Sequence, residues 1–408
     1  MKKITFLFAI AILISTAIHA QDAEANFKTS IEFLADDALE GRETGTVGAA
    51  IAAGYIAAEF QHLGLSTVSD EGYFQEFIYR PRLNPHSTKT DTTKPGVVAR
   101  NVMGFIDHGS EKTVVIGAHY DHLGHGGEGS LHAAKDGQIH NGADDNASGV
   151  AMLIYLAKEL QKDQYAGSNY LIIAFSGEEK GLLGSNFYAK NPILAHETTK
   201  YMLNFDMVGR MSADKGLIIN GVGTASEWLD LIESSNTNNV KLTTTESGIG
   251  PSDHTSFYLQ DMPVLHFFTG AHEDYHKPSD DSDKINYKGM QEVADLVCEI
   301  IKQADNKDAL SFQKTKEEKS STPRFTVTLG VMPDYAFGGE GMRIDGIIED
   351  RPAQKAGLEK GDVVIQLGDY PIDGMQGYME ALSKFSKGDK TTVKVKRGDE
   401  VIEEEIQF

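Results

Sequence analysis

The sequence predicts an α/β fold: a mixed, mostly parallel sheet covered by helices on both faces, followed by a small β-rich domain. Short, almost fully apolar segments alternate with helical patterns from about residue 98 to residue 303. A strand that is apolar along its whole length must be buried on both faces, which is typical of parallel sheets between layers of helices. A polar stretch then separates this region from a last segment with its own strand patterns and glycine turns.

The elements follow one another in a regular order. Helical patterns over residues 31–39 and 48–63 come first, and Gly64 ends the second. The strands expected next are Val114 to Ala118, Tyr170 to Phe175, Tyr201 to Phe205 and Val264 to Phe268. The helices expected among and after them are Val150 to Leu160, Trp228 to Ile232 and Tyr287 to Ile301.

Composition divides the chain into four predicted segments. Residues 1–20 carry Lys2 and Lys3 near their start, continue with an apolar run and end with small residues before Gln21. This pattern predicts a secretory signal peptide. A large domain over 21–305, a linker over 306–323 and a small domain over 324–408 follow. The apolar run of the signal is too short to span a bilayer, so no integral membrane segment is expected after cleavage. We therefore expect an exported protein, periplasmic or extracellular.

The charge of the chain restricts its partners. The formal net charge is −22, which argues against nucleic acid or an anionic membrane as a partner. The one cysteine, Cys298, cannot form an internal disulfide and is expected to fill the core.

Five potential metal ligands lie at ordered intervals, just past the ends of predicted strands or on the turns between elements. They are His119, Asp145, Glu179, Asp206 and His276. Two imidazoles and three carboxylates, with no thiolate, suit two divalent metals of the zinc type. Binding sites in open α/β sheets lie at the carboxyl ends of the strands. The spacing therefore predicts a two-metal hydrolase.

The neighbours of these ligands suggest the rest of the chemistry. Asp145 lies on a glycine-rich turn and is the natural carboxylate bridge between two metals, which would acidify a shared water and stabilise an oxyanion. Glu178 stands beside Glu179 and is free to hold the water and move its proton. Asp121, two residues after His119, is placed to hydrogen-bond that imidazole and fix its tautomer.

Several segments of the large domain resemble metallopeptidase family 28, the co-catalytic dizinc aminopeptidases. The resemblance extends over about Phe27 to Gln303. The matching segments are Leu39-Glu40-Gly41-Arg42, His119-Tyr120-Asp121, Gly142 to Gly149, Gly177-Glu178-Glu179, Gly181 to Ser185, Asn204 to Met207 and Ser252-Asp253-His254.

This resemblance implies the zinc exopeptidase fold and two Zn²⁺ per chain. The first zinc would take His119, Asp145 and Asp206, and the second Asp145, Glu179 and His276. Glu178 would be the general base, and Tyr275 is similar to a tyrosine that polarises the scissile carbonyl in part of the family. Asp144 is the less favoured bridge. The implied function is that of an exported dizinc aminopeptidase, which hydrolyses N-terminal residues from peptide substrates through a metal-bridging water activated by Glu178.

His276 also belongs to a second possible zinc-binding motif. The stretch His272-Glu273-Asp274-Tyr275-His276 fits the His-Glu-x-x-His pattern of single-zinc proteases. That pattern requires a helix, and Pro278 and the preceding Thr269-Gly270 argue against one. We therefore expect His272 to be a bystander. The nearby His122, His125, His132 and His140 could suggest a third metal, but their glycine-containing loop is expected to be solvated or to line the substrate.

The last segment resembles a PDZ domain of the bacterial protease-associated type. The matching parts are Arg351 to Leu358, Lys360 to Gly368 and a closing strand over Thr392 to Lys396. In that fold a peptide C-terminus adds a strand to a sheet edge. Leu329, Gly330 and Val331 would hold its carboxylate. The alternative is a docking or stabilising domain that binds no peptide.

Three other functions remain open at this point. One is an acyltransferase like glutaminyl cyclase, which uses one zinc on the same fold. Another is a carboxypeptidase acting on acidic dipeptides, for which Arg210 is the one basic candidate near the site. The third is an inactive scaffold that acts through its PDZ domain. The complete five-ligand set and an intact Glu178 favour the aminopeptidase.

Overall fold

The computed structural model describes residues 23–69, 71–80, 95–127, 129–132, 134, 137–307, 309–315, 327–333, 337, 339–347, 351–398 and 400–408. The predicted signal peptide and residues 316–323 of the predicted linker lie outside these ranges. Within them, no helix is long and apolar enough to cross a membrane.

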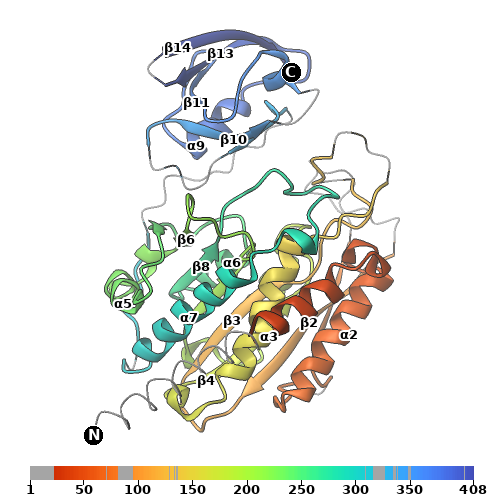
Figure 1. Cartoon of the computed structure of the whole chain (residues 1–408), viewed down its shortest axis with the longest axis vertical. Coiled ribbons are helices and arrows are strands. Elements are labelled where there is room, and N and C mark those ends of the chain that lie inside the picture. Colours follow the sequence, from red (N-terminus) through yellow and green to blue (C-terminus); the bar gives the residue numbers. More distant parts are fainter. Residues whose placement is uncertain are drawn as a thin grey trace, which may run out of the picture.

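An eight-stranded sheet forms the centre of the larger unit (Figure 1). Its strands are β1 (Phe74–Tyr79), β2 (Val97–Ile106), β3 (Thr113–His119), β4 (Asn169–Phe175), β5 (Thr199–Phe205), β6 (Leu217–Asn220), β7 (Leu242–Thr245) and β8 (Val264–Phe268). They lie in the order β1-β2-β4-β3-β5-β8-β6-β7. The pairs β4-β3, β3-β5, β5-β8 and β6-β7 are parallel and the other three are antiparallel. The prediction of a mixed, mostly parallel sheet is confirmed.

Helices cover both faces of this sheet, as the unbroken apolar strands predicted. Side chains alternate between faces along a strand, so Val114 and Ile116 of β3 join one hydrophobic cluster and Val115 joins another. The first cluster contains residues of helix 23–34, α2 (Val47–His62), α3 (Gly149–Glu159), α5 (Trp228–Ser235) and α7 (Tyr287–Ala304). The second contains residues of α4 (Leu183–Lys190) and α6 (His254–Tyr258).

Residues 309–315, here called the anchored segment, follow α7 and pack onto the larger unit. Gln313 N donates to Thr224 O at 2.8 Å, and Thr315 N donates to Tyr258 Oη at 3.0 Å. The Ser311 hydroxyl donates to Glu227 at 2.7 Å. The first part of the predicted linker is therefore held on the larger unit, against Thr224, Glu227 and Tyr258.

The C-terminal unit is a small antiparallel sheet in the order β14-β13-β11-β10-β9, with β12 beside β11 (Figure 1). Its strands are β9 (Val331–Pro333), β10 (Met342–Ile347), β11 (Val363–Leu367), β12 (Tyr370–Pro371), β13 (Lys390–Arg397) and β14 (Glu400–Gln407). Its helices are α8 (Pro352–Lys355) and α9 (Met375–Leu382). The predicted β-rich second domain is confirmed, and β9 forms one edge of its sheet.

Candidate metal centre

The predicted ligands meet at one edge of the larger sheet because parallel strands end on the same side. His119 is the last residue of β3, and Asp206 directly follows β5. Glu179 lies on the loop after β4, and His276 lies on a turn after β8. Asp145 comes from the turn that precedes α3.

Three of these side chains form a first donor group. His119 Nε2 lies 3.4 Å from Asp145 Oδ1 and 3.3 Å from Asp206 Oδ1. His119 Nδ1 lies 3.1 Å from the main-chain oxygen of Asp121. A carbonyl only accepts, so Nδ1 carries the proton and Nε2 keeps its lone pair for a metal.

A second donor group shares Asp145 with the first. His276 Nε2 lies 3.1 Å from Asp145 Oδ2 and 3.4 Å from Glu179 Oε1. Each oxygen of Asp145 therefore faces a different histidine. Asp144 points elsewhere: its Oδ1 accepts from Gly209 N at 2.7 Å and its Oδ2 lies 3.2 Å from His272 Nε2. This geometry favours Asp145 as the bridge.

The two groups fit divalent zinc in both donor chemistry and spacing. Donors about 2.0–2.1 Å from a tetrahedral zinc lie about 3.3 Å from one another. The histidine–carboxylate distances in the two groups are 3.1–3.4 Å. Their side chains are 2–13% exposed. Three carboxylates held so close together in a buried patch repel one another unless a cation lies among them.

Asp121 acts on this site through two different groups. Its main-chain oxygen makes the predicted contact with His119, while its carboxylate Oδ1 stands 4.0 Å from Nδ1, beyond hydrogen-bonding distance. That carboxylate instead accepts from Gly177 N at 2.8 Å, Glu178 N at 3.1 Å and the Thr44 hydroxyl at 2.7 Å. The side chain thus fixes the loop that presents Glu178.

Glu178 and Glu179 are neighbours in sequence, but their pKa values are shifted in opposite directions. Burial raises the pKa of Glu178 well above its usual value, and the charges of Glu179 and Asp206 add to this effect against the opposing charge of His119. Burial also acts to raise the pKa of Glu179, but His276 and a hydrogen bond from His122 outweigh it and hold that pKa well below its usual range. One carboxylate is suited to take up a proton and the other to stay ionised.

Residues 272–276 form a turn and not a helix, so the two imidazoles of the His-Glu-x-x-His pattern do not share a helix face. His276 has a φ of +55°, and its Nδ1 lies 2.8 Å from Gly129 O. The Tyr275 ring stacks on the His276 ring with 3.9 Å between centroids. Tyr275 is therefore beside the second donor group.

Arg42 and Asp280 support the site in ways that the sequence did not reveal. The Arg42 side chain is 1% exposed and donates to the carbonyls of Tyr120, Asn141 and Gly142 at 2.6–3.0 Å, and also to Leu34 O. Asp280 Oδ2 accepts from the main-chain N–H groups of Asp144 and Asp145, both at 3.0 Å. Arg42 stands in a segment already noted for its resemblance, but no local pattern showed its partners.

His122 departs from the expectation of a solvated loop. It is fully buried, and its Nδ1 lies 2.9 Å from Glu179 Oε1. His125 is exposed, as expected. His122, Asp145 and Glu179 together form a group that could hold a metal ion.

The predicted peptide loop of the C-terminal unit leads directly into edge strand β9. Leu329 is buried and its carbonyl accepts from Ala353 N at 2.8 Å, while Gly330 N donates to the Thr328 hydroxyl at 3.0 Å. Gly330 has a φ of +80°, and a Cβ there would lie 2.0 Å from Arg351 Cβ, so only glycine fits. Val331 begins the edge strand.

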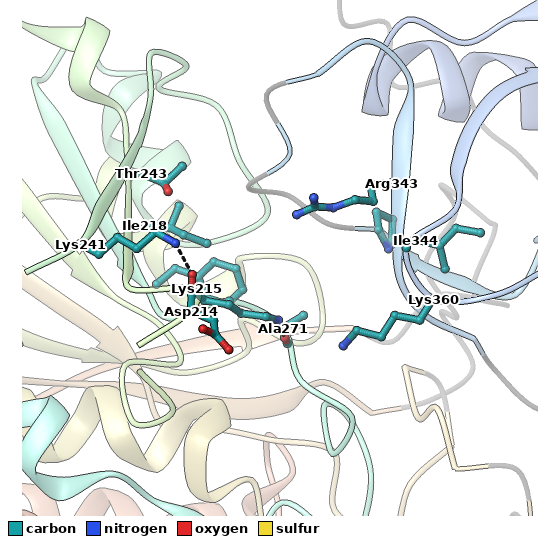
Figure 2. A pocket seen from close by; sticks show the side chains of 13 residues that line it. Asp214, Lys215, Ile218, Lys241, Thr243, Ala271, Arg343, Ile344 and Lys360 are labelled. Atoms are coloured by element: carbon teal, nitrogen blue, oxygen red, sulfur yellow. Dashed lines mark hydrogen bonds between the residues drawn. The ribbon is translucent and has the colours of Figure 1, made fainter. Parts of the chain in front are cut away.

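A cavity of about 460 Å³ lies away from these ligands, between the two units. Figure 2 shows Lys215 and Lys241 on one side of it and Arg343 and Lys360 on the other. Lys215 donates to Ala271 O and Lys241 to Asp214 O. None of the predicted metal ligands lines this cavity.

Comparison with known sequences supports both units. Residues 101–301 match Peptidase family M28, and residues 300–407 match the PDZ domain. The uncharacterized protein YfbL of Escherichia coli is 26% identical over 250 residues, which cover 52% of this chain and 74% of that protein. Aminopeptidase YwaD of Bacillus subtilis is 31% identical over 180 residues, which cover 41% of this chain and 38% of that protein.

Solved structures share the fold of the larger unit. A Zn-dependent exopeptidase from Parabacteroides distasonis superposes with a TM-score of 0.55 at 21% identity and covers 69% of this chain and 97% of its own. A glutaminyl cyclase from Bacteroides thetaiotaomicron gives 0.54 at 18% identity, with 69% and 97% covered. Residues 101–301 therefore carry a match to Peptidase family M28, and residues 300–407 carry a match to the PDZ domain.

Proposed function

We propose that this protein is an exported dizinc aminopeptidase that removes N-terminal residues from peptides. The observation that carries the proposal is the position of Asp145, whose two carboxylate oxygens lie 3.4 Å from His119 Nε2 and 3.1 Å from His276 Nε2. A carboxylate with one oxygen toward each donor group is suited to join two metals. Asp206 and Glu179 complete the two groups.

When bound, two zinc ions acidify a water and polarise the scissile carbonyl. Glu178 holds that water, takes its proton and passes it to the leaving amine, a role that its raised pKa supports. Asp121 keeps Glu178 in place through the N–H groups of the Glu178 loop. Tyr275, stacked against His276, is proposed to donate its hydroxyl to the carbonyl oxygen.

The geometry disfavours the other functions. Glutaminyl cyclases use one zinc, whereas the shared Asp145 supports two. The one basic candidate for an acidic-dipeptide pocket, Arg210, is engaged by Asp274 at 3.1 Å and lies 3.9 Å from Asp280. An inactive scaffold would have no use for a base whose pKa is raised beside a ligand whose pKa is lowered.

We further propose that the PDZ unit binds a peptide C-terminus along the edge of β9, and that residues 1–20 direct export. The N-terminal residue of the mature protein, determined by mass spectrometry, tests the export proposal. A mature chain that begins at Gln21 is expected.

The catalytic proposal is tested by metal content and by four kinds of substrate. We expect two zinc ions per chain, release of chromophore from an unblocked aminoacyl substrate, and no release from its N-acetylated form. Ring closure of a peptide with N-terminal glutamine, at one zinc per chain, would favour the cyclase. Two bound metals without turnover of any aminoacyl or acidic dipeptide substrate would favour the scaffold.

A further inference from the structure

His122 occupies a built and fully enclosed position beside the second donor group. Its side chain is 0% exposed. Its main-chain N–H donates to Arg42 O at 3.3 Å, and Arg42 itself is fixed by carbonyls from three other segments. The ring of His122 therefore has a defined position before any metal binds.

The ring makes one polar contact among the described residues, and that contact is with a predicted metal ligand. His122 Nδ1 lies 2.9 Å from Glu179 Oε1, whereas it stands 3.9 Å from Asp145 Oδ2. The ionised Glu179 carboxylate only accepts, so Nδ1 carries the proton and donates. His122 Nε2 is buried without a partner among these residues. An unsatisfied buried nitrogen costs free energy, so packing alone does not account for a histidine here.

The neighbouring turn leaves room for this ring. A Cβ on Gly142 would lie 2.5–2.6 Å from the Cδ2 and Cγ atoms of His122 and 2.1 Å from Asp145 O. Gly142 also has a φ of +56°. Glycine at this position thus allows the bridging Asp145 and the His122 ring to lie side by side.

We propose that His122 is a positioning residue for the second metal: its Nδ1–H group holds the Glu179 carboxylate in the orientation that the metal requires. This inference rests on the proposed dizinc function and adds a residue outside its five ligands. Hydrogen bonds to ligating carboxylates restrict their motion, and their loss typically lowers metal affinity 10- to 100-fold. The contact would therefore strengthen the Glu179 and His276 group and leave the Asp206 group unchanged.

The test compares two substitutions of His122 in the full chain. His122→Asn keeps an N–H donor close to the position of Nδ1, and His122→Leu keeps the volume without a donor. The matched control is His125→Leu, at an exposed histidine of the same loop whose Nδ1 faces Gly137 O at 3.0 Å. Each metal-free protein is titrated with zinc against a fluorescent chelator, and the cobalt-substituted forms are compared by visible absorption.

We expect His122→Leu to lower the zinc affinity of one site on the order of 10- to 100-fold. The affinity of its other site, and both affinities of His122→Asn and His125→Leu, should change by less than about threefold. The cobalt spectrum of His122→Asn should match the wild type. Equal losses in the Asn and Leu variants would overturn the inference and make His122 a direct ligand. Unchanged affinity in His122→Leu would also overturn it. A wild-type chain that binds only one zinc would contradict the dizinc proposal. It would leave the inference about His122 testable, because the zinc affinities of His122→Asn and His122→Leu can still be compared at the site that remains.

Discussion

The catalytic unit and the PDZ unit differ in how completely their buried polar side chains are hydrogen-bonded. Among the described residues, every buried side-chain nitrogen or oxygen without a partner lies between His122 and Gln291, in the catalytic unit. In the PDZ unit, Asp362 is the one buried charged side chain in the described part, and Arg397 and the N–H of Glu359 satisfy it. Unsatisfied buried groups cost stability and persist where a function requires them. Several of these atoms, among them His122 Nε2 and Asp280 Oδ1, belong to residues that contact the donor groups, so part of the difference follows the proposed metal site.

The largest effect should come from the proposed base. Glu178→Gln keeps the shape of the side chain but cannot take up a proton. We expect the turnover of an aminoacyl substrate to fall on the order of a hundredfold or more, with both metals retained. Elemental analysis of the variant is the control. Loss of a metal would show that Glu178 is a ligand, and the assignment of the two glutamates would have to be reversed.

The next effect concerns the bridge. Asp145→Asn should lower the zinc affinity of the chain by more than about tenfold, because it weakens both donor groups at once. Asp144→Asn is the matched control and should lower it much less, because Asp144 faces Gly209 N and His272. Zinc content after dialysis against a defined free-zinc concentration gives the measurement. Equal losses in the two variants would remove the distinction between the neighbouring aspartates.

A smaller effect is expected in the PDZ unit, where Asp362 pairs with Arg397 at 2.7 Å. Burial acts to raise the pKa of Asp362, but the hydrogen bonds from Arg397 outweigh it, so the folded-state pKa lies below the usual 3.8. The stabilisation is therefore complete above about pH 4 and is lost as the pH falls through the folded-state value. Asp362→Asn should cost about 1 kcal/mol at neutral pH, since the partner is partly solvated.

The rate of amide hydrogen exchange in β11 and β13, measured in the full chain, reports the stability of the PDZ unit. The variant should approach the wild type in exchange rate as the pH is lowered toward 3. The catalytic strands β3 and β4 serve as the internal control. A wild type–variant difference that persists unchanged in acid would show that the ion pair does not stabilise the unit.

The smallest effect should follow removal of the PDZ unit. A chain ending at Lys319 keeps the anchored segment and every proposed catalytic residue, so its kcat/KM for a small aminoacyl substrate should stay within about twofold of the full chain. A chain ending at Lys307 is the comparison, because it loses the contacts with Thr224, Glu227 and Tyr258. It should unfold at a lower temperature. A folded Lys319 chain without activity would contradict the independence of the two units.

The fold could be predicted from the sequence because its main signals are local. Strands β3 and β4 are apolar along their whole length, and such strands belong between helix layers. The convergence of the five predicted metal ligands followed from the same pattern, since parallel strands end at one edge. Helix 23–34 was placed several residues too late, because residues 37–42 continue the helical pattern as a tighter turn.

The supporting residues could not be predicted because their partners are distant in sequence. Arg42 reaches Gly142, a hundred residues away, and Asp280 reaches Asp145 across 135. His122 was grouped with the other histidines of its loop, but it is buried against Glu179 whereas His125 is exposed, a difference that depends on contacts distant in sequence. A hydrogen bond from Asp121 to His119 was expected, and the main-chain oxygen of Asp121 lies at that distance while its carboxylate does not, a choice that depends on a rotation that sequence does not encode.

The contacts of Arg42 and Asp280 also determine when, during synthesis of the chain, the metal centre can form. Arg42 leaves the ribosome early, yet its carbonyl acceptors on Asn141 and Gly142 do not exist until about a hundred more residues have been made. The turn that carries Asp145 is clamped from its other side by Asp280, close to the end of the catalytic unit. Non-local contacts of this kind form late in folding. Zinc that reached a growing chain would meet scattered donors, so the centre can be charged with metal only once synthesis of the unit is nearly complete.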